Sequence, residues 1–257
     1  MSLFHALILS FVEGITEFLP ISSTGHMVLV SEILKIQQTD FVKTFEILIQ
    51  PGAILAVIVL YYKKLFNTKI WPQLLAAFLP AAVIGFLFFK IIKSYLLGND
   101  LVTVAALFIG GIAFIAIEYF QKKDKRELNS DLEKITIKNA FIIGLFQSVS
   151  VIPGVSRSGA TILGGLILGN KRKVAAEFSF ILAIPTMLAA SALDLVKTNF
   201  SFTSNEIVTL IIGFIFSFLV ALTAIKLLMR FLSNHDFTYF GIYRIIVAVI
   251  FFLIFLR

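Results

Sequence analysis

Two segments of this chain combine carboxylates, hydroxyls, glycines and basic groups inside apolar sequence. The first carries Glu13 and Glu17 ahead of the run Ser22-Ser23-Thr24-Gly25-His26. The second is the run Pro153-Gly154-Val155-Ser156-Arg157-Ser158-Gly159-Ala160-Thr161. Burying a charged group away from water costs free energy unless the group is paired, so apolar sequence rarely carries such groups without a use for them. We therefore take these two segments as the candidates for chemistry.

In the first segment, Glu13 and Glu17 are four residues apart and lie on one face if the segment is helical. Two carboxylates at that spacing can hold a divalent cation between them or share a proton. The structural alternative is a protonated or arginine-paired couple at a helix interface. His26 is a candidate for acid–base or nucleophilic catalysis, and Ser23 is a hydroxyl that a neighbouring base could activate.

The second segment has the composition of an anion cradle. Its two glycines let backbone N–H groups turn toward a ligand, its hydroxyls add donors, and its arginine supplies a fork of donors that matches phosphate oxygens. A helix beginning near Ser158 would add the positive end of its dipole. The alternative is that Arg157 only pairs with a glutamate to close the structure. The expected phosphate ligands are Ser156, Arg157, Ser158 and Thr161.

The composition indicates whether the helices or strands that position these two segments lie in water or in a membrane. Of the 257 residues, 59% are hydrophobic and 14% are charged, and the mean hydropathy is +0.98. A domain of this length cannot hide so many apolar side chains in one core, which excludes a water-soluble enzyme and indicates a bilayer. The absence of cysteine excludes disulfides and thiolate metal sites. The net charge of +7 is explained by basic cytoplasmic loops, so we expect no nucleic-acid partner.

Six apolar blocks approach the roughly 20 residues that a membrane-spanning helix needs. They are residues 47–62, 71–89, 101–117, 178–193, 207–225 and 237–256. Residues 5–27 and 140–170 are also apolar, but Gly, Pro and Ser break them and free backbone groups that hydrocarbon cannot satisfy. We predict that each of these two segments is a re-entrant helical hairpin with its loop at membrane depth.

A shift of 134 residues superimposes the two broken segments. It places Ala6 on Ala140, Ile8 on Ile142, Glu13 on Gln147, Ser22 on Ser156, Gly25 on Gly159 and, later, Pro51 on Pro185. Each half then holds one hairpin and three spans, and three crossings invert the second half. The predicted fold is an all-α integral membrane protein with six transmembrane helices and two re-entrant helical hairpins in an inverted-topology repeat. One domain covers residues 1–257, with repeats at 1–120 and 139–257 and a charged cytoplasmic linker at 121–138 that has no catalytic role.

The basic residues predict the orientation. Thirteen lie on one side of the predicted spans: Lys63, Lys64, Lys69, Lys122, Lys123, Lys125, Arg126, Lys134, Lys138, Lys171, Arg172, Lys173 and Arg230. Six lie on the other side: Lys35, Lys43, Lys90, Lys93, Lys197 and Arg257. Cytoplasmic loops carry the excess of Lys and Arg, so both termini are expected outside. Arg244 lies inside the last span, where it needs a carboxylate partner or a path for its side chain to the interface.

The two motifs resemble the signature motifs of the bacterial undecaprenyl-diphosphate phosphatase family linked to bacitracin resistance, and the resemblance covers essentially the whole chain. It implies hydrolysis of undecaprenyl diphosphate to undecaprenyl phosphate and inorganic phosphate, which recycles the lipid carrier of cell-wall polymers. It also implies a divalent cation, Mg²⁺ or Ca²⁺, and an active site in the cell membrane that opens to the extracytoplasmic face. The implied catalytic residues are Glu17, Ser23, His26 and Arg157. The implied cation ligands are Glu13 and Glu17, and the implied phosphate ligands are Ser22, Thr24, Ser156, Arg157, Ser158 and Thr161.

Several alternatives stay open at the level of sequence. The nucleophile is Ser23, His26 or a metal-bound water, and we favour Ser23 or His26 with Glu17 as base or metal ligand. A secondary transporter or flippase for an anionic lipid is the main alternative function, because inverted repeats with broken helices are a transporter architecture. A phosphatidic-acid-type phosphatase would carry a histidine six residues after Arg157, where Leu163 stands. A purely structural scaffold would leave the buried charges unexplained, and a homodimer is left open.

Overall fold

The computed structural model describes residues 1–88, 99–123, 127–197 and 202–255. Within these ranges the chain is all-helical, with no strand beyond an isolated bridge between Asn129 and Asn170. The helices are α1 (Leu3–Thr16), α2 (Ser23–Ile33), α3 (Asp40–Leu65), α4 (Trp71–Leu87), α6 (Asp100–Lys123), α7 (Ile137–Ser148), α8 (Arg157–Ile167), α9 (Arg172–Lys197), α10 (Ser204–Phe231) and α11 (Thr238–Phe255). Short 3-10 helices are η1 (Thr68–Ile70), η3 (Leu132–Lys134) and η4 (Val149–Val151). The prediction of an all-α protein is therefore confirmed.

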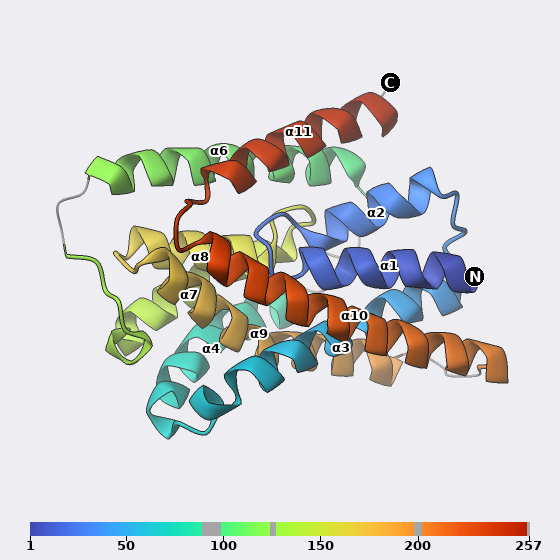
Figure 1. Cartoon of the computed structure of the whole chain (residues 1–257), viewed down its shortest axis with the longest axis horizontal. Coiled ribbons are helices and arrows are strands. Elements are labelled where there is room, and N and C mark those ends of the chain that lie inside the picture. The colour runs from blue at the N-terminus through green and yellow to red at the C-terminus, as the bar shows by residue number, and fades with distance from the viewer. Residues whose placement is uncertain (89–98, 124–126, 198–201, 256–257) are drawn as a thin grey trace.

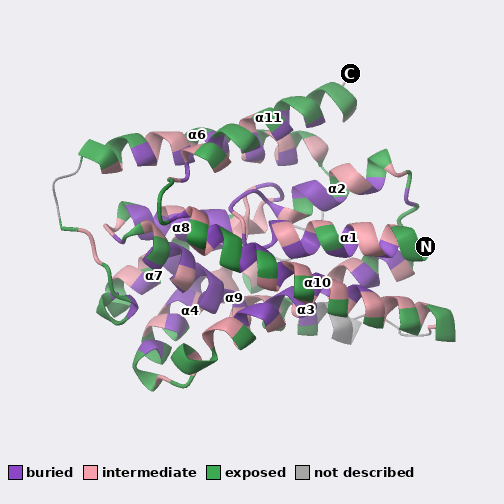
Figure 2. Cartoon of the chain, in the orientation of Figure 1, coloured by how far each residue is buried: buried purple, intermediate pink, exposed green. Residues whose placement is uncertain are grey.

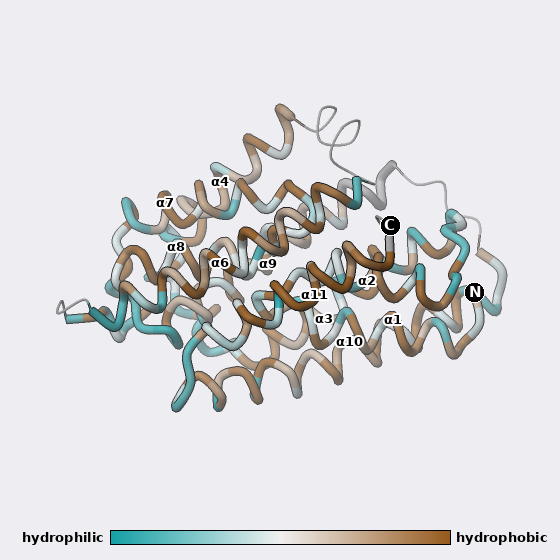
Figure 3. Tube along the Cα trace, turned by 90° about the horizontal axis from the view of Figure 1, so that it is seen from above, coloured by the Kyte–Doolittle hydropathy of each residue, from teal (hydrophilic) through white to brown (hydrophobic). Residues whose placement is uncertain are grey.

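Five helices are long and apolar enough to cross a membrane, namely α3, α4 together with η1, α6, α9 and α10. The sixth predicted span corresponds to α11, an apolar helix of 18 residues. Figure 3 shows hydrophilic residues gathered toward the two ends of the long axis and hydrophobic residues between them, which is the pattern of a multi-pass membrane protein. The basic residues Lys90, Lys93, Lys125, Arg126 and Arg257 lie outside the described residues.

Four helices, α3, α6, α9 and α10, extend past the predicted blocks because their polar ends stay helical. Helix α3 begins at Asp40 behind the N-cap Thr39, whose side chain accepts a hydrogen bond from the Val42 N–H, whereas the apolar block begins seven residues later. Helix α10 likewise begins at a capping box in which Thr203 and Glu206 exchange hydrogen bonds. Hydropathy marks the lipid-facing part of a helix, and caps mark where its backbone hydrogen bonds begin.

Both broken segments form pairs of short helices, α1 with α2 and α7 with α8. In Figure 1 the two pairs come from opposite ends of the long axis, and the loops that connect their helices meet near the middle. Helices α2 and α8 each have 11 residues. Helix α2 starts at Ser23 and helix α8 starts 134 residues later, at Arg157. The starting end of α1 and the final end of α11 lie at the same end of the molecule in both views (Figures 1 and 3).

Small residues let the helices around these pairs approach closely. Helix α7 packs on α4 and α1 packs on α10, and Figure 2 shows buried residues on the faces that these elements turn inward. A Cβ added at Gly144 on α7 would lie 2.4 Å from the backbone oxygen of Ala77 on α4. A Cβ at Gly52 on α3 would lie 2.5 Å from the backbone oxygen of Phe214 on α10. Membrane helices associate through such close backbone approaches, because lipid supplies no hydrophobic force between them.

A buried carboxylate fixes the start of α11. Glu118 on α6 is fully buried and accepts hydrogen bonds from the Arg172 guanidinium at 2.8 Å and from the Phe237 N–H at 3.0 Å. One side chain therefore joins α6, the first turn of α9 and the residue before α11. This junction holds α11, the helix that carries Tyr243 and Arg244.

The close approach of α4 and α7 predicts a sharp difference between two glycines. Gly144→Ala must push α7 away from the Ala77 backbone, so we expect a loss of about 1–3 kcal/mol of stability, the usual cost of overpacking. Gly85→Ala is the matched control on α4, because no atom lies within 4 Å of a Cβ built there. Thermal unfolding of both purified variants in detergent measures the difference. Equal unfolding temperatures for Gly144→Ala and Gly85→Ala would contradict the packing described here.

Candidate active site

The two central loops end in serines with the same backbone conformation. Ser22 has φ 73° and Ser156 has φ 72°, the left-handed region that side chains other than glycine rarely adopt. Each serine caps the helix that follows, because the Gly25 N–H donates to Ser22 Oγ at 3.3 Å and the Gly159 N–H donates to Ser156 Oγ at 3.0 Å. The hydroxyl cap offsets part of the roughly 1–3 kcal/mol of backbone strain. As a result, the positively polarised N-termini of α2 and α8 both begin at the loops.

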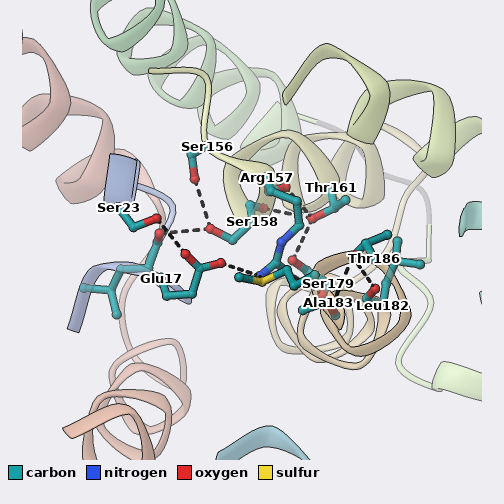
Figure 4. A network of polar contacts seen from close by, with 12 residues as sticks. Glu17, Ser23, Ser156, Arg157, Ser158, Thr161, Ser179, Leu182, Ala183 and Thr186 are labelled. Atoms are coloured by element: carbon teal, nitrogen blue, oxygen red, sulfur yellow. Dashed lines mark hydrogen bonds and ion pairs between the residues drawn. The ribbon is translucent and has the colours of Figure 1, made fainter. Parts of the chain in front are cut away.

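Glu17 joins the two loops (Figure 4). Its Oε1 accepts a hydrogen bond from the Arg157 Nη2 at 2.8 Å, and its Oε2 accepts one from the Ser23 hydroxyl at 2.6 Å. The carboxylate is 7% exposed and the arginine side chain is 12% exposed. This contact brings together residues 140 positions apart in the sequence. The structure therefore unites a hydroxyl, a carboxylate that can take its proton, and a guanidinium, all predicted from the two motifs.

Further contacts of Arg157 hold its guanidinium in one place. Nη1 donates to the backbone oxygen of Ser179 at 3.0 Å, and the guanidinium lies 5.8 Å from the centre of the Phe18 ring. Its Nη2 also lies 3.1 Å from Met187 Sδ, whereas its buried Nε has no hydrogen-bond partner among the described residues. The guanidinium is therefore fixed through Nη1 and Nη2, whereas the Nε–H donor stays unused within the described part of the chain.

The hydroxyls of the second motif form two sets of contacts. Ser158 Oγ donates to the backbone oxygen of Leu19 at 2.9 Å, and Ser156 Oγ lies 3.0 Å from Ser158 Oγ. Thr161 Oγ1 contacts Ser179 Oγ at 2.6 Å (Figure 4). The Ser158 bond crosses from the second hairpin to the first, so the hydroxyls predicted as phosphate ligands also fasten the two loops together.

His26 makes its hydrogen bonds with neither the hydroxyls of the second motif nor Glu17. Its Nδ1 lies 2.7 Å from the backbone oxygen of Ser22, and its Nε2 lies 2.8 Å from the hydroxyl of Tyr243. A carbonyl can only accept, so Nδ1 carries a proton, and the neutral ring then accepts the Tyr243 proton at Nε2. The two rings also stack, with centroids 5.6 Å apart and planes 4° apart. Both ring nitrogens are thus engaged, which makes His26 a less available nucleophile than Ser23.

Glu13 lies one helical turn before Glu17 and is 1% exposed. Its Oε1 has no hydrogen-bond partner within the described residues, and the carboxylates of Glu17 and Glu46 are close enough to act on it electrostatically. The described residues hold no group of three or more His, Cys, Asp or Glu side chains suited to a metal. Mg²⁺, however, commonly binds one or two carboxylates together with substrate phosphates. The unpartnered oxygen of Glu13 next to Glu17 fits that kind of site.

Arg244 corrects an expectation from the sequence. It is fully buried, and no carboxylate pairs with it in the described structure, nor does its side chain reach the interface. Instead it donates to four backbone oxygens: Leu107 at 3.3 Å, Pro20 at 3.0 Å, Ala106 at 3.1 Å and Gly154 at 2.9 Å. Pro20 and Gly154 belong to the first and second loops. Arg244 therefore satisfies backbone groups that the breaks in both hairpins set free.

Two predicted hydroxyls differ from the rest. The Ser22 hydroxyl is buried and acts as the cap of α2, and Thr24 is exposed with no hydrogen bond of its hydroxyl among the described contacts. Sequence reasoning also missed Ser179 and Tyr243, which contact Arg157 and His26. Both stand in apolar blocks with no motif around them. The only signal in the sequence is that each of them is a polar side chain inside an apolar block.

Comparisons with known proteins point to one family. The family model described as "Bacitracin resistance protein BacA" matches residues 6–250. The undecaprenyl-diphosphatase of Aquifex aeolicus is 52% identical over 252 residues, which cover 98% of this chain and 98% of that protein. The proteins of the same name from Sulfurihydrogenibium sp. and Wolinella succinogenes are each 50% identical over 253 residues, covering 98% of this chain and 99% and 97% of theirs.

The match to residues 6–250 covers both motifs, and it agrees with the resemblance that the two motifs carry. The chain belongs to the bacitracin resistance protein BacA family.

Proposed function

We propose that this protein is a membrane phosphatase that hydrolyses undecaprenyl diphosphate to undecaprenyl phosphate and inorganic phosphate. Relatives about half identical over nearly the whole chain carry the name undecaprenyl-diphosphatase. The observation that carries the proposal is the chain of contacts from Ser23 through Glu17 to Arg157. A transporter for an anionic lipid needs the arginine, but it has no use for a serine bonded to a carboxylate at 2.6 Å.

Phosphoryl transfer depends mainly on positioning and on neutralising charge on the phosphoryl oxygens. Arg157, the Ser156 and Ser158 hydroxyls, and the N-termini of α2 and α8 supply positive or donor groups around Glu17 and Ser23. The terminal phosphate of the substrate binds there, with its prenyl chain in the lipid. The binding of an anion by Arg157 loosens its hold on Glu17 and leaves that carboxylate more basic.

The proposed reaction has two steps. Ser23 Oγ attacks the terminal phosphorus while Glu17 takes the serine proton, and the bond to the undecaprenyl phosphate oxygen breaks. The proton passes from Glu17 to the departing undecaprenyl phosphate. A water molecule then attacks the phosphoserine, its proton moves to Glu17 and from there to the leaving Ser23 oxygen, and inorganic phosphate is released. His26, held by Tyr243, orients the first turn of α2 that carries Ser23.

We propose that Glu13 and Glu17 hold a divalent cation, Mg²⁺ or Ca²⁺, together with oxygens of the substrate. The unpartnered Oε1 of the buried Glu13 supports this assignment. A cation there neutralises phosphate charge when it is bound.

We also propose the finer topology: six spans and two re-entrant hairpins in an inverted repeat, with both termini and the active-site opening outside. Three observations support it. The hairpin helices recur at an offset of 134 residues, the two hairpins come from opposite ends of the molecule, and α1 starts at the end where α11 finishes. The charge count of thirteen against six supports an orientation with that end outside the cytoplasm.

The central test is phosphate release from undecaprenyl diphosphate by the purified protein in detergent. We expect Arg157→Ala to lower kcat/KM by about 10²–10³-fold, because it removes the main counter-charge. Arg157→Lys should recover little, since an ammonium lacks the planar fork. Circular dichroism checks that both variants are folded. If the wild type released no phosphate, the transporter alternative would replace the phosphatase, and if Arg157→Ala stayed active the arginine would have no role in binding.

A second prediction identifies the nucleophile. Rapid acid quenching of the wild type with substrate labelled in the terminal phosphate should leave the label on Ser23, found by peptide mapping. Ser23→Ala should abolish the label and lower the rate by about 10³-fold or more. His26→Ala should slow turnover by about tenfold yet still form the labelled enzyme, because the histidine only orients the helix. Label that survives in Ser23→Ala and vanishes in His26→Ala would assign the histidine instead.

A third prediction concerns the cation. Glu13→Gln removes the charge and keeps the shape, so we expect the Mg²⁺ concentration for half-maximal activity to rise at least about tenfold. Binding of Mn²⁺, measured by paramagnetic resonance without substrate turnover, should weaken in parallel. Glu206→Gln, at the exposed start of α10, serves as the control. Unchanged Mn²⁺ binding in Glu13→Gln would remove the cation from this carboxylate.

A further inference from the structure

A groove of about 1100 Å³ runs between α1, α10 and α11. Its walls are almost entirely apolar, as Phe216, Leu219, Val220 and Leu227 on α10 illustrate. Its volume slightly exceeds the roughly 300–1,000 Å³ that small-molecule sites occupy. None of the side chains assigned to catalysis or to the cation lines it, so the proposed reaction does not account for it.

Two residues connect this groove to the active site. Leu19 lines the groove, and its backbone oxygen accepts the hydrogen bond from Ser158. Tyr243 also lines the groove, and its hydroxyl bonds to His26. Leu19 and Tyr243 thus lie between the groove and the active site. It follows α10 from Phe216 to Phe231, about 22 Å at 1.5 Å per residue, and ends at Asn234 and His235 in the turn before α11.

We infer that this groove holds the part of the substrate's prenyl chain that extends away from the diphosphate. The inference rests on the proposed function and specifies it further. A diphosphate at Arg157 and Ser23 is anchored at the loops, so its chain must leave the site through an apolar exit. The groove offers such an exit, and its length of about 22 Å is enough to guide several isoprene units.

The groove acts on orientation more than on affinity. Lipid tails are as apolar as the groove walls, so moving the chain from lipid into the groove gains little hydrophobic free energy. The aromatic and branched walls restrict the chain to one path and thereby hold the terminal phosphorus in line with Ser23. Chain length therefore determines turnover, because a short chain does not reach the far part of the groove.

The test fills the groove with a large side chain at two exposed positions. Leu227 is 56% exposed and Thr223 is also exposed, so Leu227→Trp and Thr223→Trp do not overpack the core. Ile215→Trp is the control, because Ile215 is 51% exposed on the same helix and does not line the groove. The two substrates are undecaprenyl diphosphate and farnesyl diphosphate, whose chain has only three isoprene units.

We expect the two groove variants to lower kcat/KM for undecaprenyl diphosphate by about tenfold. Their kinetics with farnesyl diphosphate, and those of Ile215→Trp with both substrates, should match the wild type. Equal effects on both substrates, or none on either, would overturn the groove assignment while leaving the phosphatase intact. A wild type that hydrolyses neither substrate would instead overturn the proposed function.

A second measurement needs no turnover. A polyprenyl monophosphate with a photoreactive group at the far end of its chain should crosslink to peptides of α10 and α11 around Leu227 and Tyr239. Crosslinking spread evenly over the lipid-facing helices would show that the chain lies in bulk lipid, which would contradict the inference.

Discussion

The structure depends on one constraint, that a charged side chain buried among apolar groups needs an opposite charge or several hydrogen bonds. Glu17 and Arg157 satisfy it by meeting at 2.8 Å across the two hairpin loops. Without this pairing, Glu17 and Arg157 would each be an uncompensated buried charge, which costs several kcal/mol. The pairing that makes the hairpins stable is also what places a guanidinium beside a serine–carboxylate couple. The ion pair between Glu17 and Arg157 therefore both packs the two loops together and assembles the site.

The same principle applies to neutral backbone groups. Loops at membrane depth expose carbonyl oxygens that hydrocarbon cannot satisfy. Arg244 donates to Pro20 in one loop and to Gly154 in the other, besides two carbonyls of α6. One side chain therefore fastens both loops to a spanning helix. The Glu118 junction holds that helix at its other end. Rigid support of this kind keeps irregular loops in a single conformation, as a site for phosphoryl transfer requires.

The sequence predicted the features that a few neighbouring residues determine, namely the breaks in the two short-helix segments and the donor groups of the second motif. Glycine, proline and serine in apolar sequence mark the breaks, and Ser156 to Thr161 show their donor pattern without any structure. The partners of Arg244 could not be predicted, because backbone oxygens carry no residue signature. Tyr243 was missed for a related reason, since it lies 217 residues from His26 and resembles any interfacial aromatic residue. Helix ends were underestimated because hydropathy ignores capped polar turns, as at Asp40.

The separation of Glu17 and Arg157 along the chain has a consequence for biogenesis. The ribosome must add 140 residues after Glu17 before its partner exists. At about 5–20 residues per second this takes roughly 7 to 28 s. During that interval the first hairpin must keep its carboxyls protonated, wait near the membrane surface, or be sheltered by the insertion machinery. The ion pair that joins the two loops can therefore form only after the second loop has been translated, so the site is completed late in synthesis.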